Sequence, residues 1–319
     1  MKRVNIAVIF IALLTIWSCS NGDDKIVAEL IPYKRISMYD VNSTDPNIKY
    51  ISQYFANYDR VLITDVDSSD YWFNYSNSYK TILKIMPPAK ENISKGIQML
   101  DELLIQSYSP DFIKKHFPYS LILSDAINTY KSGNPVFTNI YVGSYFIATK
   151  VQDITRMSQE EKTNLANDLN TNLWTYINDY NPFLKIAPIF YTFGQPYYGK
   201  SVYSSNPEAA EWFDNANWAT NGDRTFYNKL YSSGFITPST LVYSKNAQGQ
   251  INGIKSVIFP SQKRDQLSWI LYLLNTPDSE VQAFVNSNPS LKTKYDCLVK
   301  AFTDAGIDYK QIGYKPNTK

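Results

Sequence analysis

Residues 158–180 read SQEEKTNLANDLNTNLWTYINDY and carry the longest helix signal in the middle of the chain. Ser158 followed by Glu161 is the capping-box pattern, in which a hydroxyl and a carboxylate satisfy the first free amides of a helix. Apolar residues then recur every three or four positions on one stripe: Leu165, Leu169, Leu173, Tyr176 and Ile177. This spacing predicts an amphipathic helix whose apolar face lies in the core and whose polar face is Asn and Thr.

Shorter signals on both sides of this helix predict an α+β fold class. Short β-branched runs bounded by turn residues predict strands at residues 60–65, 79–86, 119–123, 138–142 and 145–149, the last two as a hairpin, with a loop over residues 124–137. Apolar periodicity predicts helices at residues 44–55, 89–108, 261–275, 278–286 and 291–305, and residues 229–236 and 248–253 are rich in turn residues. We therefore expect a small mixed sheet with flanking helices in the first half and a mostly helical second half.

The first 18 residues have the composition of an export signal. Lys2 and Arg3 precede an apolar run that is too short to cross a membrane, because a spanning helix needs roughly 20 apolar residues. The sequence LTIWSC at residues 14–19 resembles a bacterial lipobox, and SNGDDK at residues 20–25 resembles the surface-export signal of Bacteroidota lipoproteins. We expect a cleaved signal peptide and a palmitate-bearing Cys19 that anchors the protein in outer-membrane lipid, facing the cell exterior. A plain secretory signal is the alternative.

Charge and cysteine content limit the partners. Cleavage before Cys19 takes two of the 31 basic residues and leaves 29 to balance the 29 acidic ones, so no basic stripe is left and nucleic acid is not an expected partner. With Cys19 acylated, Cys297 has no disulfide partner and is predicted to be a buried small apolar residue. Residues 19–43 are predicted as a tether and residues 44–314 as a single domain, with a sub-domain hinge near residues 155–160 as an option.

The order of these parts resembles the zinc-binding metallopeptidase-like lipoproteins of the Bacteroidota. The resemblance is carried by the lipobox, Pro87-Pro88 before a long helix, DFIKKHFP at residues 111–118, a hairpin before the central helix, and KYDCLVKAFTDAGIDYKQI at residues 294–312. It covers roughly residues 40–314. The resemblance implies a zincin-like arrangement in which the helix at residues 158–180 is the metal-bearing one.

The metal motif of that family is missing from this chain. HExxH works because residues i and i+4 of a helix point two imidazoles at one zinc ion, while the glutamate takes a proton from the bound water. The matching residues 170–174 read NTNLW, and a neighbouring register at residues 169–173 reads LNTNL; neither contains a histidine or a glutamate. Of a downstream acidic segment only Asp265 remains, and we expect it to be a solvated or salt-bridged surface group. The one histidine, His116, is expected on the solvent side of a helix C-terminus. No zinc ligands, catalytic residues or cofactor are therefore predicted.

Other kinds of catalysis have weaker signals. Asp65, Asp67 and Asp70 place several oxygens together, but the spacing lacks the Gly and the closing Glu of a calcium loop. No Gly-rich phosphate loop occurs, and any Ser-His-Asp or Cys-His system would depend on His116. Paired carboxylates for glycoside hydrolysis need no sequence spacing, so that option stays open.

The chain is rich in aromatic residues, with 26 Tyr, 16 Phe and 6 Trp. The candidates for ligand binding are loop aromatics: Tyr197, Tyr198, Tyr203, Trp212 and Trp218. Such rings stack on a sugar or peptide while the OH or NH makes a hydrogen bond, although rings of this kind also fill cores. The same two interpretations apply to the aromatic loop at residues 68–78.

The sequence predicts a surface lipoprotein that binds a peptide or glycan without catalysis, with a nutrient-import complex as a candidate partner. The alternative is an active hydrolase that uses carboxylates or an unconventional metal site.

Overall fold

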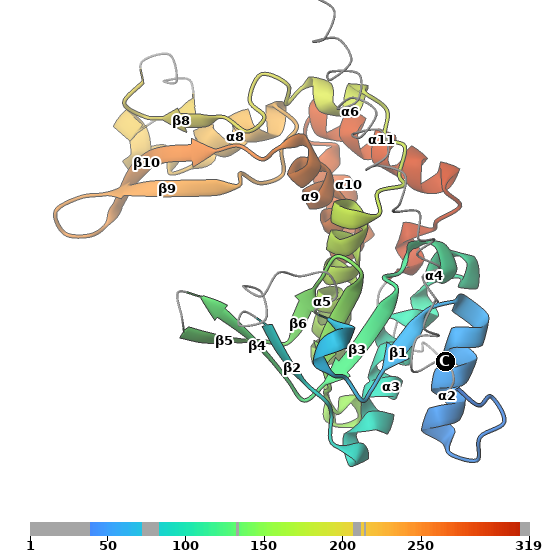
Figure 1. Cartoon of the computed structure of the whole chain (residues 1–319). Helices are drawn as coiled ribbons and strands as arrows, with labels where there is room; N and C mark the ends of the chain where they lie inside the picture. Colours follow the sequence, from blue (N-terminus) through green and yellow to red (C-terminus); the bar gives the residue numbers. More distant parts are fainter. Residues whose placement is uncertain (1–38, 72–82, 132–133, 207–211, 214, 313–319) are drawn as a thin grey trace, which may run out of the picture. The chain divides into compact units, whose positions relative to one another are not determined.

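The structure is a computed structural model, and it describes residues 39–71, 83–131, 134–206, 212–213 and 215–312 (Figure 1). Two compact units divide the chain, residues 1–53 and 54–319, and each is described by itself. The signal peptide, Cys19 and most of the tether lie outside the described residues, so these assignments stay predictions. Within the described residues, no helix is both long enough and apolar enough to cross a membrane.

In the first unit, the structure describes residues 39–53. Helix α2 (Pro46–Tyr58) starts there and continues into the second unit. Ser52 Oγ accepts a hydrogen bond from the amide of Asp40 at 2.8 Å and donates to the carbonyl of Ile48 at 2.7 Å. These contacts fix the approach of the chain to the helix, which begins at a proline as the sequence predicts.

A four-stranded sheet forms the centre of the first half of the second unit. Its order is β1 (Val61–Ile63), β3 (Ser120–Ser124), β7 (Phe146–Lys150) and β6 (Ile140–Val142); the first three strands are parallel and β6 pairs antiparallel to β7. Strands β1 and β3 are buried along their whole length, which explains why they read as continuous apolar runs. The predicted strands and the predicted hairpin are confirmed.

A second, antiparallel sheet has the order β2 (Leu83–Met86), β4 (Ala126–Lys131) and β5 (Asn134–Thr138) (Figure 1). The predicted loop over residues 124–137 is therefore wrong. The strands were missed because β5 is an exposed edge strand that contains Pro135, a residue that weakens any strand signal. Residues 79–82, part of the predicted second strand, lie outside the described residues.

Capping residues mark where two helices of the first half begin. The predicted helix at residues 89–108 consists of α3 (Ile93–Leu103) flanked by single 3₁₀ turns, because Leu104 leaves helical geometry at φ −132°. Ser109 then caps α4 (Pro110–His116). The central helix α5 (Gln159–Tyr180) has the predicted capping box, in which the Ser158 amide donates to Glu161 Oε2 at 2.7 Å and the Glu161 amide donates to Ser158 Oγ at 3.2 Å.

The last part of the chain is helical, as predicted. It comprises α9 (Gln262–Asn275), α10 (Asp278–Val285) and α11 (Pro289–Asp304). Before it come α6 (Ile189–Thr192), α7 (Trp218–Asn221) and α8 (Arg224–Ser232). Further 3₁₀ turns lie at Ser68–Asp70, Ile154–Arg156, Asn215–Asn217 and Tyr309–Gln311.

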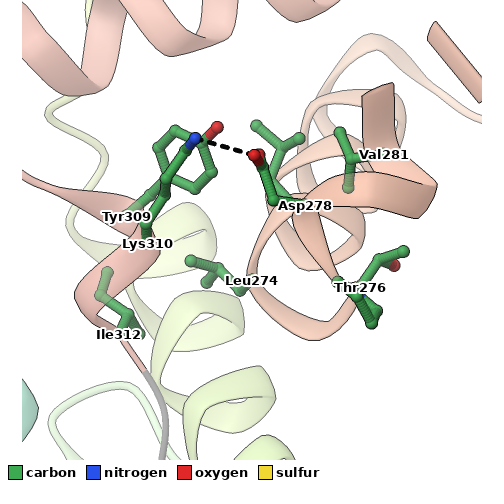
Figure 2. A pocket seen from close by; sticks show the side chains of 9 residues that line it. Leu274, Thr276, Asp278, Val281, Tyr309, Lys310 and Ile312 are labelled. Atoms are coloured by element: carbon green, nitrogen blue, oxygen red, sulfur yellow. Dashed lines mark hydrogen bonds and ion pairs between the residues drawn. The ribbon is translucent and has the colours of Figure 1, made fainter. Parts of the chain in front are cut away.

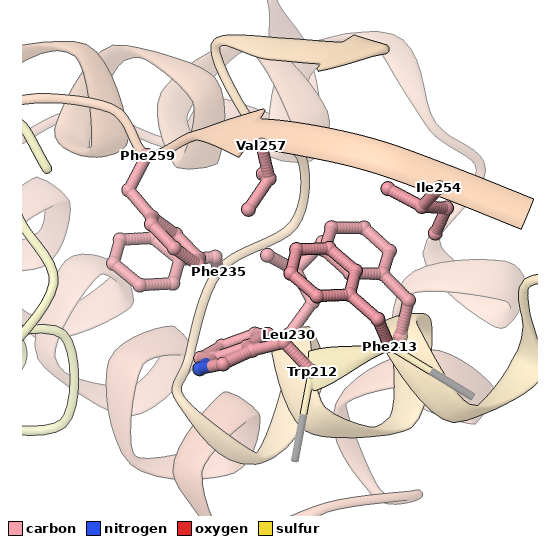
Figure 3. Packing of buried hydrophobic residues seen from close by; sticks show 8 residues of the cluster. Trp212, Phe213, Leu230, Phe235, Ile254, Val257 and Phe259 are labelled. Carbon is pink, nitrogen blue, oxygen red and sulfur yellow. The ribbon is translucent and has the colours of Figure 1, made fainter. Parts of the chain in front are cut away.

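A third sheet interrupts this helical half, with the order β8 (Ser201–Tyr203), β10 (Ile251–Ile258) and β9 (Thr240–Lys245). Residues 229–236 and 248–253, predicted to be rich in turns, contain turns but also the end of α8 and the start of β10. The sheet itself was not predicted. Gly249, at φ 78°, allows the tight reversal between β9 and β10. Beneath the sheet lies a mainly aromatic cluster, shown in Figure 3: Trp212, Phe213, Phe226, Leu230, Phe235, Ile254, Val257 and Phe259.

Candidate functional site

The buried face of α5 holds the two positions where the sequence resemblance places zinc ligands, Asn170 and Trp174. Both side chains are buried. Trp174 Nε1 donates a hydrogen bond to Tyr108 Oη at 2.9 Å, and Tyr108 Oη donates to Asn170 Oδ1 at 2.6 Å. The Asn170 amide group donates to the carbonyl of Ala166 at 2.8 Å. We call Trp174, Tyr108 and Asn170 the neutral set.

The chemistry of the neutral set does not fit zinc. Catalytic zinc takes imidazole, thiolate or carboxylate ligands, whereas the indole N–H of Trp174 only donates and the Asn170 amide is turned to its own helix. Burial raises the pKa of Tyr108, so its hydroxyl keeps its proton. In the parts of the chain that the structure describes, no group of three or more His, Cys, Asp or Glu side chains could hold a metal ion.

The acidic run at residues 65–70 serves a local turn. Asp67 Oδ1 accepts the amide of Ser69 at 2.7 Å, and Asp70 Oδ2 accepts the amide of Asp67 at 2.7 Å. These reciprocal bonds form a capping box on the 3₁₀ turn Ser68–Asp70. Carboxylate oxygens engaged in this way satisfy backbone amides at the start of the turn.

Asp265 is buried, and the expectation of a surface carboxylate is wrong. It lies in the first turn of α9 and is 1% exposed. Lys294 of α11, which is 0% exposed, places Nζ 2.5 Å from Asp265 Oδ2. Tyr198 Oη donates to the same oxygen at 2.6 Å. We call Asp265, Lys294 and Tyr198 the charged set. No local sequence signal predicts it, because its members come from three separate segments.

Aromatic rings enclose the charged set. Lys294 Nζ lies 4.7 Å from the ring centroid of Phe190 and 5.1 Å from that of Phe235, within the range of cation–π attraction. Gly234, at φ 77°, faces the lysine stem, and a Cβ there would lie 2.8 Å from Lys294 Cε. Burial raises the pKa of Asp265 and lowers the pKa of Lys294, while each partner's charge opposes the other's shift.

The five aromatic candidates lie in different environments. Trp212 is 2% exposed inside the aromatic cluster, and Tyr197 packs edge-on against it at 4.9 Å between ring centroids. Tyr198 belongs to the charged set, and half-buried Trp218 donates from Nε1 to the carbonyl of Ile251 at 3.1 Å. Tyr203 on β8 is 53% exposed. Their role in ligand binding stays a prediction, and Tyr203 offers the most accessible ring of the five.

Tyr203 belongs to the outer face of the β8–β10–β9 sheet. Val257 of β10 is buried on the aromatic cluster, and the residues beside it along the strand point the opposite way. Register places Tyr203, Ser256 and Val242 in one row across the three strands and Ser201, Ile258 and Thr240 in the next. These six residues, which we call the outer face, carry no charge and combine an aromatic ring, two aliphatic side chains and three hydroxyls.

His116 is partly buried, which corrects the expected solvent-side position. Its ring stacks on Phe183 at 3.7 Å between centroids and contacts Phe112 at 5.0 Å. The Nδ1 atom is buried and has no hydrogen-bond partner among the described residues. Burial, reinforced by nearby Lys115, lowers the pKa of His116. Cys297 is likewise only partly buried.

A small cavity of about 120 Å³ lies between α9, α10 and the turn Tyr309–Gln311 (Figure 2). Leu273, Leu274 and Val281 supply much of its apolar wall, and the ion pair of Lys310 with Asp278, at 3.0 Å, lies at its rim. Pockets for drug-sized ligands measure roughly 300–1,000 Å³. This cavity is too small to enclose a peptide or a glycan.

Comparison with known proteins gives a distant structural neighbour. No family model and no curated protein matches the chain. A crystal structure described as a "putative zinc-binding metallo-peptidase" from Bacteroides caccae is similar over 86% of this chain and 92% of that chain, with a TM-score of 0.44 and 9% sequence identity. Nothing of its chemistry is transferred to this chain at such values.

Proposed function

We propose that this protein is a lipid-anchored surface protein with a zincin-like arrangement, without a catalytic zinc site, that binds a peptide or glycan. The neutral set is the observation that supports the absence of zinc catalysis in this proposal. Its three side chains pair with one another or with the helix backbone at the position where the sequence resemblance places a metal. A zinc ion there would break these bonds and gain no imidazole or carboxylate in return.

The binding part of the proposal rests on the outer face. An exposed tyrosine beside Ser256 and Val242 offers an uncharged surface on which a sugar ring or an uncharged peptide segment can stack. The neighbouring hydroxyls of Ser201 and Thr240 can then hydrogen-bond to ligand hydroxyl or amide groups. Because the sheet packs on the aromatic cluster, its strands hold these groups in one row after another on the outer face.

Binding is tested with glycan and peptide arrays probed by the purified protein, followed by titration of any ligand found. Tyr203→Ala should weaken binding at least tenfold, because a tyrosine that anchors a ligand at the centre of a binding surface typically contributes about 2 kcal/mol or more. Tyr180→Ala is the matched control, since Tyr180 is 52% exposed but lies at the end of α5. Equal affinities of the two variants for the ligand would show that the outer face is not the binding surface.

Catalysis is tested by metal analysis of the purified protein and a peptidase assay with and without added zinc. We expect no stoichiometric zinc and no cleavage. Stoichiometric zinc with chelator-sensitive cleavage would overturn the non-catalytic proposal in favour of an unconventional metal site. Cleavage that chelators do not affect would favour the carboxylate hydrolase instead.

A further inference from the structure

Lys294 and Asp265 form a fully buried pair that joins α11 to α9. Their side chains are 0% and 1% exposed, and Nζ lies 2.5 Å from Oδ2. The pair of Lys300 and Asp304 on α11 has a similar separation of 2.7 Å, but more than half of each side chain is exposed. The two pairs therefore differ in water access far more than in distance.

The surroundings of the buried pair favour neutral forms of both groups. The rings of Phe190 and Phe235 lie beside Lys294 Nζ, and the hydrogen bond from Trp269 Nε1 to the carbonyl of Gly234 holds the neighbouring backbone in place. Removing two ions from water is costly even when they are paired. Burial raises the pKa of the Asp265 carboxyl and lowers that of the Lys294 amine against the opposing charge of each partner, so burial acts toward the acid and the free amine that a condensation uses.

We propose that Lys294 and Asp265 condense to form a side-chain amide, an isopeptide bond that links α11 to α9. Lys294 Nζ attacks Asp265 Cγ, so one N–C bond forms. The bond from Cγ to Oδ2 breaks, and that oxygen leaves as water with the carboxyl proton and one proton from the amine. No atom is oxidised or reduced, and no co-reactant is needed. The product is an uncharged amide, which removes both buried charges.

Tyr198 is positioned to move the proton. Its hydroxyl lies 2.6 Å from Asp265 Oδ2, the leaving oxygen, and 3.5 Å from Lys294 Nζ, the attacking atom. A group that contacts both atoms can donate to the leaving oxygen while it accepts from the amine. The amine is already held against the carboxyl group, so the reaction needs no encounter step and the entropic cost of bringing two molecules together is avoided.

Mass spectrometry of the denatured full chain tests the proposal. The bond removes one water, so we expect a mass about 18 Da below that calculated for the same N-terminal form. Lys294→Arg retains the positive charge but should not show this loss. The matched control, Lys300→Arg, changes the exposed pair and should keep it. A chymotryptic digest should contain the α9 and α11 peptides joined through Asp265 and Lys294.

Two further variants examine the chemistry. Asp265→Asn can form the same amide by releasing ammonia, so its loss should be about 17 Da in place of 18. Tyr198→Phe lacks the proton-transfer group and should lower the linked fraction in freshly purified protein at least tenfold. An unaltered linked fraction would overturn the role of Tyr198.

The wild-type chain alone can overturn the bond itself, even where variants fail to fold. A wild-type mass equal to the calculated value, with no joined peptides in the digest, shows that the two side chains are not linked. A water loss that persists in Lys294→Arg shows that the loss arises elsewhere in the chain. Either result contradicts the proposal.

Discussion

The neutral set and the charged set each place a tyrosine hydroxyl between two buried side chains, yet they differ in what burial costs. In the neutral set, Tyr108 accepts from Trp174 and donates to Asn170, so each polar group is matched and no charge leaves water. In the charged set, Tyr198 donates to the carboxyl group of Asp265, which also faces the amino group of Lys294, so two groups that are ionised in water are buried. The same residue type therefore completes a neutral hydrogen-bond chain in one case and screens a buried ion in the other.

This difference shows that the cost of removing one member of a buried polar set depends on what is left unpaired, a dipole or a charge. Loss of a member of the neutral set leaves an unpaired donor or acceptor, which costs the desolvation of one dipole. Loss of Lys294 leaves an uncompensated carboxylate in an aromatic enclosure. The predictions below use substitutions that separate these two costs.

The largest effect is expected for Lys294→Met. It removes the partner of Asp265, bonded or ionic, and leaves that carboxyl group buried alone, so the free energy of unfolding should fall by about 3–5 kcal/mol. The double variant Lys294→Met/Asp265→Leu should recover part of this loss, because it removes both charges. Urea unfolding followed by circular dichroism gives both values. A single variant as stable as wild type would contradict the distinction between the two sets.

Tyr108→Phe should have an intermediate effect. It leaves Trp174 Nε1 without an acceptor and Asn170 Oδ1 without a donor, so we expect a loss of about 1–3 kcal/mol in the free energy of unfolding. The exposed control Tyr180→Phe should change stability little. The same unfolding experiment compares them. A loss as large as that of Lys294→Met would mean that charge is not what separates the sets.

The smallest effect concerns His116, a partly buried residue that belongs to neither set. Burial lowers its folded-state pKa below the usual 6.5, so the unfolded chain takes up the proton first. Its contribution to stability is therefore complete above pH 6.5 and declines as the pH falls from there toward the lowered folded-state pKa. Unfolding midpoints measured between pH 7.5 and 5.5 should fall less in His116→Phe than in wild type. Parallel pH curves for the two proteins would show that His116 is not the group responsible.

The sequence by itself determined the local elements of this protein. The capping box at Ser158, the apolar stripe of α5, the buried strands near residues 61–63 and 120–124 and the three C-terminal helices follow from patterns within a few residues. Such patterns are readable because capping and amphipathicity act between neighbours in the chain. Weak patterns failed, as in β4, β5 and the β9–β10 hairpin, whose residues are partly exposed and whose pairing supplies much of their stability.

Only the tertiary structure decided which side chains meet. Asp265 and Lys294 are 29 residues apart and Tyr198 and Lys294 are 96 apart, so their contact depends on how α9, α11 and the segment after α6 pack together. The same holds for Tyr203, whose exposure depends on which face of its sheet covers the aromatic cluster. Burial and charge pairing are set by packing across the whole unit, and a local sequence pattern carries no information about distant partners.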